Sequence, residues 1–359
     1  MVSVDHDELR GYVAALLAGA GMTPPDAKQM ADCLVESNLW GVDSHGVLRV
    51  PIYVERLRSG AMNPRPRLDI VAEHGAVAVL EGDGGPGFLA GLAGMRHAVT
   101  HAGEHGVGVC AVRDSNHFGA AGLYARAALD EGMIGIAMTN VMPNMVAPGG
   151  SRPVVGNNPL AVAVPAPTPF PIVLDISLSA AAGGKLLLAS KRGEKIPLDW
   201  ATDAEGHPTD DPDAAFAGFL LPIAGVKGLG LAYIVDILCG VLAGGAFGWD
   251  VKSMYAYPKE RSETGHFLVA LDIGAFMDRA EFDARMARYC ASVKGSPLWD
   301  DTAEMLLPGE LEHRTEVRRR AEGIPLPRGL YDELLELGHG FAGLPSLHRL
   351  RVVSTPSSR

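Results

Sequence analysis

The spacing of apolar and polar residues divides the chain into a helical beginning, a mixed centre and a helical end. In the first part apolar residues recur at helical spacing, with Gly41 and Gly60 as stop signals. Helices are predicted there at residues 5–18, 24–40 and 51–59. The proline-rich segment NPRPR, residues 63–67, then marks a first boundary.

Beyond residue 67 short strand-like runs alternate with helical ones. Strands are predicted at residues 71–80, 107–113, 134–139, 160–164, 172–176 and 266–272, and helices at 89–103, 119–132 and 228–242. Charged helical sequence returns at 280–294 and 309–338. We therefore expect a helical segment over residues 1–67, a sheet-containing region over 68–275 and a second helical segment over 276–359.

Charge and cysteine content narrow the functional classes. The formal net charge of −11 argues against general binding to nucleic acid or to anionic membranes. The four cysteines are scattered without a CxxC pair, which is typical of reduced thiols in a cytosolic protein. The start of the chain has no basic n-region and no apolar h-region, so no secretory signal is expected. The longest apolar run, 229–246, contains Asp236 and several glycines, which predicts a buried helix and no membrane span.

The segment from Gly41 to Arg49, GVDSHGVLR, places an imidazole in a bend between two predicted helices. Ser44 or Asp43 is near enough in sequence to fix the tautomer of His45. Arg49 offers a planar fork for a carboxylate. A group that titrates near neutrality beside a permanent cation suits proton transfer to a small anionic substrate. The alternative is a surface histidine and a solvated arginine at a helix junction.

Two glycine-rich segments are candidates for a phosphate or dinucleotide site. Gly82 to Gly87, GDGGPG, matches GxGxxG between a strand-like run and a helix, although Pro86 removes an N–H that would face a phosphate. The alternative is a plain glycine turn. Gly225 to Gly230, GVKGLG, sets Lys227 before a buried helix, where a cation resembles a phosphate clamp, but its spacing is not that of a P-loop.

A third candidate is Ser115 to Gly122, SNHFGAAG, between a strand and the start of a helix. Backbone amides at a helix N-terminus bind phosphate, and glycines there let a cofactor approach closely. His117 could contact a nicotinamide, a substrate carbonyl or a phosphate. The alternative is a histidine and an asparagine that cap the helix.

Metal binding and hydrolysis are less well supported by the sequence. His97, His101 and His105 recur at i, i+4 and i+8 on one helix face, but no matching Cys, Asp or Glu pair is evident, so a solvated face is favoured and no metal is expected. A serine hydrolase would use Ser44 with His45. The chain has no G-x-S-x-G, and adjacent residues make a poor nucleophile–base pair.

Seven segments in one order carry a resemblance to a known family. They are VDSHGVLRVPIYVERLRSG, SNHFGAAGLYARAALDEGMIGIAMTN, GNNPLAVAVP, LDIS, WATDAEGHPTDDP, GVKGLGLAYIVDILCGVLAGG and LLPGE. The series resembles the malate/L-lactate dehydrogenase family of NAD(P)-dependent 2-oxoacid reductases that lack a Rossmann domain. The resemblance covers about Glu8 to Leu337, and seven ordered motifs are far more specific than any one of them.

The resemblance implies roles for individual residues. His45 would donate the proton to the carbonyl, oriented by Ser44, although His117 lies in the motif that supplies the acid/base group in some members. Substrate contacts would come from Arg49, Tyr53 and Asn116. The cofactor, NAD with NADP as the alternative, would lie along His117, Phe118, Gly119, Ala120, Ala121, Asp175, Ile176, Ser177, Val226, Lys227, Gly309 and Glu310. The GxGxxG at Gly82 becomes a family turn.

The resemblance also implies a fold and an assembly. The fold class is a mixed α/β (α+β) arrangement, with a largely antiparallel, non-Rossmann cofactor domain and a helical domain built from both termini. A cytoplasmic homodimer is expected, with the cofactor in an interdomain cleft near the partner subunit. One departure concerns the segment after LDIS, where many members have Arg-Gly-Lys and this chain has Ala181-Ala-Gly-Gly-Lys185.

The expected activity is the interconversion of a small 2-oxo acid and its 2-hydroxy acid. The alternatives are a cyclic imino-acid reductase of the same family, a hydrolase that uses Ser44 and His45 without nicotinamide, and a protein that binds the cofactor without turnover. Neither the substrate nor the choice between NAD and NADP follows from the sequence.

Overall fold

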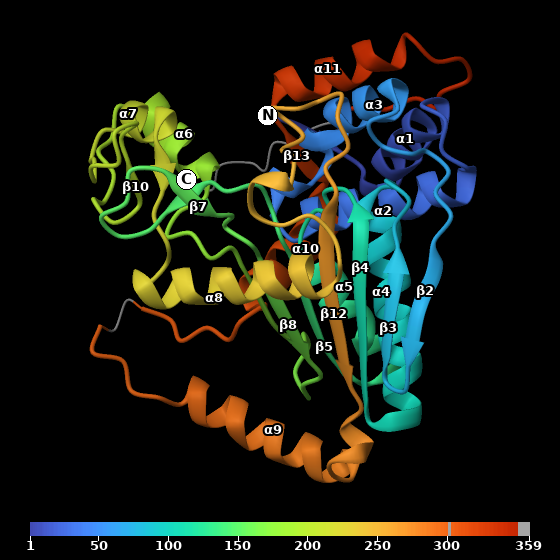
Figure 1. Cartoon of the computed structure of the whole chain (residues 1–359), viewed down its shortest axis with the longest axis vertical. Coiled ribbons are helices and arrows are strands. Elements are labelled where there is room, and N and C mark those ends of the chain that lie inside the picture. The colour runs from blue at the N-terminus through green and yellow to red at the C-terminus, as the bar shows by residue number, and fades with distance from the viewer. Residues whose placement is uncertain (301–302, 351–359) are drawn as a thin grey trace, which may run out of the picture. The chain divides into compact units, whose positions relative to one another are not determined.

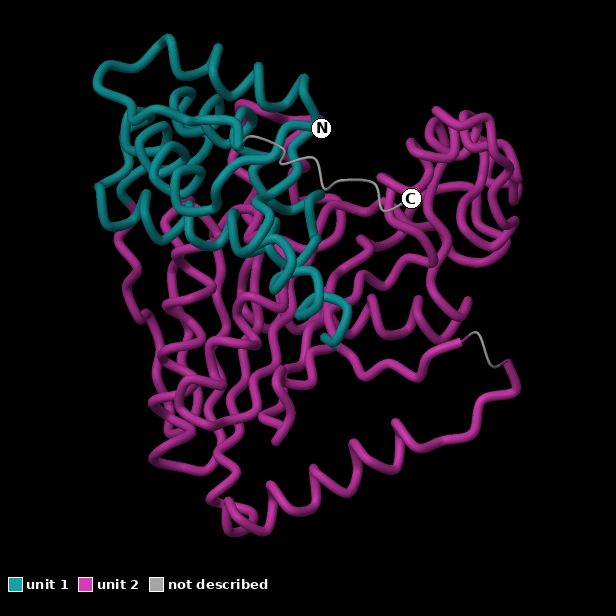
Figure 2. Tube along the Cα trace, turned by 180° about the vertical axis from the view of Figure 1, so that it is seen from behind, with its two compact units in different colours: residues 1–65, 309–359 teal, residues 66–308 magenta. Residues whose placement is uncertain are grey.

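The computed structural model describes residues 1–300 and 303–350. The chain forms two compact units, one made of residues 1–65 with the residues from 309 onward, the other of residues 66–308 (Figure 2). The first predicted boundary, after residue 67, lies two residues from this division. The second lies at 308/309 instead of 275/276, because α9 (Arg279–Lys294) belongs to the second unit. Its charged helical pattern does not reveal which core it joins.

Unit 1 is mainly helical and contains both ends of the described chain, as expected. Its elements are β1 (Val2–Val4), α1 (His6–Gly19), α2 (Pro24–Leu39), η1 (Asp43–His45), η2 (Val47–Arg49), α3 (Val50–Ser59), α10 (Glu310–Glu322), β13 (Ile324–Leu326) and α11 (Arg328–Gly338). Strands β1 and β13 pair antiparallel. The helix expected over 309–338 is interrupted at Gly323, whose φ of 85° ends α10 before β13 begins.

Unit 2 is built on a seven-stranded sheet of order β2-β3-β4-β12-β5-β8-β9. The strands are β2 (Asp69–His74), β3 (Val77–Glu81), β4 (Val107–Ser115), β5 (Ile134–Thr139), β8 (Leu160–Val164), β9 (Ile172–Ile176) and β12 (Thr264–Leu271). Within this described sheet β3 and β4 run parallel and the other neighbours are antiparallel. The prediction of a mixed, largely antiparallel fold is confirmed.

The predicted strand at 71–80 is in fact a hairpin. Gly75, with φ 53°, lies between β2 and β3, where only a residue tolerant of the left-handed region fits the turn without strain. The sequence prediction passed over this glycine because the apolar alternation continues on both sides of it.

Helices cover both faces of the sheet, as Figure 1 shows. On one face lie α4 (Gly87–His105), α5 (Gly122–Ala127) and η3 (Ala128–Glu131). Gly94 of α4 fits against Val112 and Leu268, at distances that would crowd a side chain. On the other face α8 (Val226–Asp236) continues as a π-helical segment, Ile237–Leu242, and packs with Met138, Leu229 and Cys239 in one apolar cluster.

A second sheet in unit 2 has the order β10-β11-β6-β7. Its strands are β6 (Met145–Val146), β7 (Pro153–Val155), β10 (Ala201–Thr202) and β11 (Phe219–Leu220), accompanied by α6 (Gly183–Arg192) and α7 (Pro212–Ala217). Short 3₁₀ turns, η5 (Gly248–Asp250) and η6 (Ile273–Ala275), complete the unit. The sequence prediction missed this sheet, because strands of two or three residues carry too little periodicity to detect.

Among residues 1–300 and 303–350, no helix combines the length and the apolar character that crossing a bilayer requires. The four cysteines are all buried and unbridged. Burial raises the pKa of Cys33 and of Cys110 to about 12, which keeps these thiols protonated and unreactive.

Candidate active site

The His45 turn in unit 1 is held by Asn38, a residue of α2. The side-chain oxygen of Asn38 accepts a hydrogen bond from the Val47 amide at 2.8 Å. Gly46 passes so close that a Cβ there would lie 2.1 Å from that same oxygen. The glycine in DSHGVLR is therefore required by the approach of a side chain to the backbone.

Asp43 is fixed by a residue far away in sequence. Its carboxylate accepts hydrogen bonds from Arg319 Nη1 at 2.6 Å, Arg319 Nη2 at 2.9 Å and Asn38 Nδ2 at 2.6 Å. Arg319 also donates to the backbone oxygen of Asn38. A two-pronged arginine–carboxylate pair is geometrically strict, so it sets the course of the turn that carries His45. The sequence analysis missed Arg319, because nothing local to it signals a partner 276 residues away.

Ser44 is the residue that contacts the His45 ring. Its Oγ lies 2.9 Å from His45 Nδ1, while its backbone oxygen accepts from Arg49 Nε at 2.7 Å. One short segment thus links the serine, the imidazole and the guanidinium. The imidazole is partly buried, and this burial together with the Arg49 cation lowers the pKa of His45 to about 4.

Tyr53 follows on α3 and is fully buried, as is Arg56 in the next turn. Burial raises the pKa of the Tyr53 hydroxyl well above its ordinary value, so this group stays protonated. Arg56 escaped the sequence analysis, since an arginine on an amphipathic helix normally lies on the solvated face.

In unit 2 the SNHFGAAG segment leaves the sheet at an irregularity. The pairing of β4 with β12 shifts register between Thr264 and His266. Asp114 on one strand and Glu263 before the other both adopt positive φ, 45° and 54°. Bulges of this kind re-aim side chains next to functional sites. Here the irregularity brings the Ser115 hydroxyl to the ring of His266.

His266 is fully buried and ties three strand ends together. Its Nε2 lies 2.9 Å from Ser115 Oγ of β4, and its Nδ1 lies 2.8 Å from Thr139 Oγ1 of β5. Thr139 in turn donates to the backbone oxygen of Gly265 at 2.8 Å. Both ring nitrogens are therefore engaged, and burial lowers the pKa of His266 to about 3, so the ring is neutral.

The ring of His266 continues into an aromatic stack under the candidate motif. Phe118 stacks on His266 with ring centroids 4.5 Å apart, and on Tyr124 of α5 at 4.4 Å. The Tyr124 hydroxyl donates to the backbone oxygen of Phe118. Buried Phe118 thus anchors the segment, while its neighbour His117 remains partly exposed and its Nδ1 accepts from the Gly119 amide at 3.3 Å.

The glycine turn after β3 supports this segment and offers no phosphate cradle. The amide of Gly82 donates to the Arg113 oxygen at 2.9 Å, and that of Gly84 to the Asp114 oxygen at 2.8 Å. The side chain of Asn116 donates from Nδ2 to the oxygens of Gly84 and Gly85. These amides already donate to backbone oxygens of the protein and are not available to a phosphate. The interpretation of GDGGPG as a Rossmann dinucleotide-binding motif is therefore wrong. Asn116, predicted to bind substrate, is buried against this turn.

Comparison with known proteins decides the family. The family model for malate/L-lactate dehydrogenase matches residues 4–335. The chain belongs to this family. Its resemblance on sequence motifs is thereby confirmed.

Relatives and solved structures agree with that assignment. The chain is 38% identical over 353 residues to a malate dehydrogenase of Pyrococcus abyssi, covering 96% of each chain. It is 38% identical over 317 residues to the L-sulfolactate dehydrogenase of Methanocaldococcus jannaschii, covering 88% of this chain and 91% of the relative. The solved structure of a sulfolactate dehydrogenase from that organism superposes with a TM-score of 0.89 over 95% of this chain and 97% of its own, at 36% identity.

Members of the family differ in cofactor and substrate. Among the other relatives are a (2R)-3-sulfolactate dehydrogenase named for NADP⁺ and a ureidoglycolate dehydrogenase named for NAD⁺. The relatives are thus NAD(P)-dependent dehydrogenases, and both forms of the cofactor occur among them.

The start of α8 fits an anionic cofactor. Helices α1, α2 and α7 are capped by Asp5, Thr23 and Asp211, whereas α3, α4, α5, α6, α9, α10 and α11 have no side-chain cap hydrogen bond among the described residues. Helix α8 begins at Val226 with no side-chain cap among the described residues and carries Lys227 in its first turn. Uncapped amides beside a lysine attract phosphate.

The other predicted cofactor residues lie in both units. Asp175 accepts from the Gly122 amide at 2.8 Å and so fixes the start of α5, next to Gly119, Ala120 and Ala121. Ser177 Oγ lies 3.1 Å from Ser179 Oγ, beyond Ile176. In unit 1, Gly309 adopts φ 90° before α10, and Glu310 pairs with Arg314 at 2.5 Å. In the segment Ala181–Lys185, which departs from the Arg-Gly-Lys of many family members, the Lys185 ammonium lies over the Trp200 ring.

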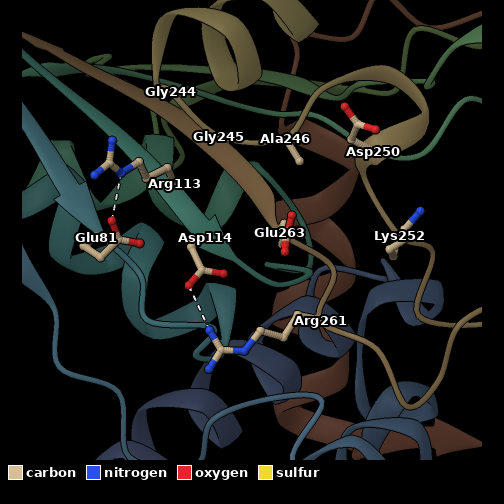
Figure 3. Close-up of a pocket in the computed structure, with 10 residues that line it drawn as sticks. All are labelled: Glu81, Arg113, Asp114, Gly244, Gly245, Ala246, Asp250, Lys252, Arg261 and Glu263. Carbon is tan, nitrogen blue, oxygen red and sulfur yellow. Dashed lines mark hydrogen bonds and ion pairs between the residues drawn. The ribbon is translucent and has the colours of Figure 1, made fainter.

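A charged cavity of about 690 Å³ also lies in unit 2 (Figure 3). It is lined by Glu81, Arg113, Asp114, Gly244, Gly245, Ala246, Asp250, Lys252, Arg261 and Glu263. Figure 3 shows two ion pairs in its wall, Arg113–Glu81 at 2.8 Å and Arg261–Asp114 at 3.0 Å. None of the residues predicted to bind substrate or cofactor is among those ten, so we do not assign the family's reaction to this cavity.

Proposed function

We propose that this family member is an NAD(P)-dependent 2-hydroxyacid dehydrogenase that interconverts a small 2-oxo acid and its 2-hydroxy acid. The observation that carries the proposal is the His45 turn, where Ser44 joins an imidazole and a guanidinium within one segment. Family membership supplies the reaction class.

The two functional groups of the turn have separate roles. When bound, the nicotinamide exchanges a hydride with the substrate. The His45 imidazole gives a proton to the oxygen that was the 2-carbonyl, or removes it in the oxidative direction. Ser44 at Nδ1 orients the ring, which assigns the proton transfer to Nε2. Arg49 binds the substrate carboxylate and thereby presents one face of the carbonyl.

The low pKa of His45 makes proton uptake part of substrate binding. At neutral pH the imidazole of the unliganded protein is uncharged, because its pKa is about 4. A substrate carboxylate at Arg49 offsets that cation and raises the pKa of the imidazole. The oxo acid therefore binds together with a proton, whereas the hydroxy acid meets a base that is already deprotonated.

The names of the relatives support a proposal for the substrate class. Malate and sulfolactate both carry a second anionic group beyond the carboxylate next to the hydroxyl-bearing carbon, and these substrates name relatives at 36–38% identity. We propose a substrate of that kind, with NAD as the cofactor and NADP as the alternative. A second candidate is reduction of a cyclic imino acid, since a solved Δ1-piperideine-2-carboxylate reductase superposes with a TM-score of 0.83 at 27% identity.

The test is oxidation of NADH and of NADPH with a panel of substrates, followed at the nicotinamide absorbance. The panel holds oxaloacetate, sulfopyruvate, pyruvate, 2,3-diketogulonate, oxalurate and a cyclic imino acid. We expect turnover on an oxo acid with a second anionic group, reduced about 10²–10⁴-fold in His45→Gln. The matched variant His117→Gln separates the two histidines, because the one that donates the proton loses kcat.

Contrary outcomes are distinct. Turnover on the imino acid alone would replace the first candidate by the second. Reaction with a serine-directed phosphonate, without nicotinamide binding, would favour the hydrolase. Binding of NADH without turnover on any compound would leave a cofactor-binding protein and overturn the proposal.

We also propose that the protein is a homodimer, formed through the exposed face of α8 and its π-helical continuation. The apolar residues of this face are about half exposed: Leu231 50%, Ile234 53%, Ile237 48%, Val241 53% and Leu242 63%. The helix α9 buries only Cys290 and lies apart from the sheet in Figure 1. The exposed apolar face of α8, together with a helix α9 that buries a single residue, favours a second copy of the chain as the partner.

A further inference from the structure

We propose that the end of α4 is a binding site for a transition-metal ion such as Zn²⁺, with His101, Glu104 and His105 as ligands. These side chains lie outside the proposed active site. The inference therefore does not depend on the dehydrogenase reaction.

The three side chains already lie together. One ligand atom of each lies within 4.8 Å of those of the other two. The rings of His101 and His105, one helical turn apart, are nearly parallel at 14° with centroids 6.3 Å apart. Neighbouring ligands of tetrahedral zinc are roughly 3.4 Å apart, given metal–ligand distances of about 2.0–2.1 Å. Because His105 and Glu104 are exposed, rotation of their side chains can close the remaining gap.

A second carboxylate reaches the cluster from the neighbouring strand. Glu73 of β2 places Oε1 3.2 Å from His101 Nε2. Glu73 is not one of the three residues whose ligand atoms all lie within 4.8 Å of one another, so it contributes negative charge beside His101 and is not counted as a ligand. The sequence analysis found the histidine series but overlooked Glu104 of the same helix, and it could not place Glu73, since β2 is brought beside α4 only by the fold.

The burial of His101 is otherwise unexplained. The residue is only 7% exposed, and its Nε2 faces the exposed carboxylate of Glu73 at 3.2 Å. A buried polar ring with one partner, an exposed carboxylate, gains little stability. Coordination of a metal gives such a ring a strong bond that the packing alone does not supply.

The local electrostatics favour a cation. His105 is the last residue of the 19-residue helix α4, where the helix dipole places partial negative charge. Glu73 and Glu104 add two carboxylates. Two imidazoles with carboxylates select a borderline metal such as Zn²⁺, Co²⁺ or Ni²⁺ over Mg²⁺ or Ca²⁺, which prefer oxygen ligands alone.

The experiment is calorimetric titration of the full, untagged, chelator-treated protein with Zn²⁺, repeated with Co²⁺ to follow its visible absorption. We expect a single ion per chain and a rise in melting temperature with Zn²⁺. His105→Ala and Glu104→Gln, both at exposed positions, should each weaken binding by about tenfold or more and reduce the thermal shift. The control is His97→Ala, one turn before His101 and outside the cluster, which should bind as the unaltered protein does.

Three results would overturn the site. The first is Zn²⁺ binding that is unchanged in His105→Ala and Glu104→Gln. The second is the absence of binding in the unaltered protein at millimolar Zn²⁺. Loss of binding in His97→Ala with binding kept in His105→Ala would likewise reject this ligand set. Because the metal readouts need no turnover, a failure here is separate from a failure of the proposed dehydrogenase.

Discussion

At the scale of single residues, His45 faces two opposing demands. A proton donor to a carbonyl must carry a proton, yet burial and Arg49 lower the pKa of this imidazole to about 4. Burial is the larger cause, and Arg49, which we propose binds the substrate carboxylate, adds to it. A bound carboxylate would offset the guanidinium charge and so remove the second of these two effects. In the proposed mechanism the turn therefore acts as a base when empty and as an acid when an oxo acid is bound.

This arrangement predicts different pH profiles for the two directions. Since kcat/KM reports the free enzyme, kcat/KM for oxo-acid reduction should fall about tenfold per pH unit above roughly pH 5, where the protonated imidazole becomes scarce. The kcat/KM for hydroxy-acid oxidation should be flat over the same range, because the base is already neutral. Initial rates in both directions across pH provide the measurement. A reduction profile flat to pH 7 would show that His45 is not the donor, and His117→Gln is the control.

The residue scale also shows which contacts a sequence can reveal. The contacts among Ser44, His45 and Arg49 join residues at most five apart, so the motif predicted their proximity. The pair Asp43–Arg319 spans 276 positions, and no pattern near either residue announces it. The sequence suggested that Asp43 could contact the ring of His45, whereas in the structure its carboxylate accepts hydrogen bonds from Arg319.

At the scale of elements, the junction of β4, β12 and β5 fixes the segment that carries His117. His266 links Ser115 and Thr139, and Phe118 stacks on its ring. The sequence predicted each of these strands but not their order in the sheet, which requires knowing how distant strands pair. The role of His266 was invisible for that reason, since a histidine in an apolar strand has no distinctive local signal.

The burial of His266 predicts acid sensitivity of the fold. Its pKa is about 3 in the folded protein and about 6.5 when exposed, so the unfolded chain binds the proton more readily between those values. Stability from this group is complete above about pH 6.5 and is lost as the pH falls toward 3. We expect the melting temperature to drop between about pH 7 and pH 5. The drop should be smaller in His266→Gln, which cannot titrate.

A second substitution separates charge from hydrogen bonding. His266→Leu leaves the Ser115 and Thr139 hydroxyls without the ring, so it should destabilise the protein by about 1–3 kcal/mol at either pH. Equal drops in melting temperature for the unaltered protein and His266→Gln would show that other groups control the acid response. Urea unfolding at the two pH values measures both effects.

At the scale of the whole molecule, the sequence predicted a helical part built from both termini and a largely antiparallel sheet, and the structure contains both. The spacing of apolar residues predicted the helices, while the prediction of a largely antiparallel sheet came from the family resemblance. The second predicted boundary differs from the division between the two units, because α9 resembles the charged helices of unit 1 in composition. In α9 only Cys290 is buried. The pattern of polar and apolar residues indicates how much of a helix is exposed to solvent, but it does not indicate which unit the helix belongs to.

The unpartnered surface of unit 2 gives the last prediction, which concerns assembly. Ile234 lies in the middle of the apolar face of α8 and is 53% exposed. If a second copy covers it, Ile234→Glu buries an unpaired charge, which costs roughly 3 kcal/mol and weakens association about a hundredfold. Light scattering after size exclusion should then show a dimer for the unaltered protein and a monomer for the variant. Val71→Glu, at a similarly exposed apolar position on β2, should stay dimeric. A monomeric unaltered protein, or a dimer indifferent to Ile234→Glu, would remove this face from the interface.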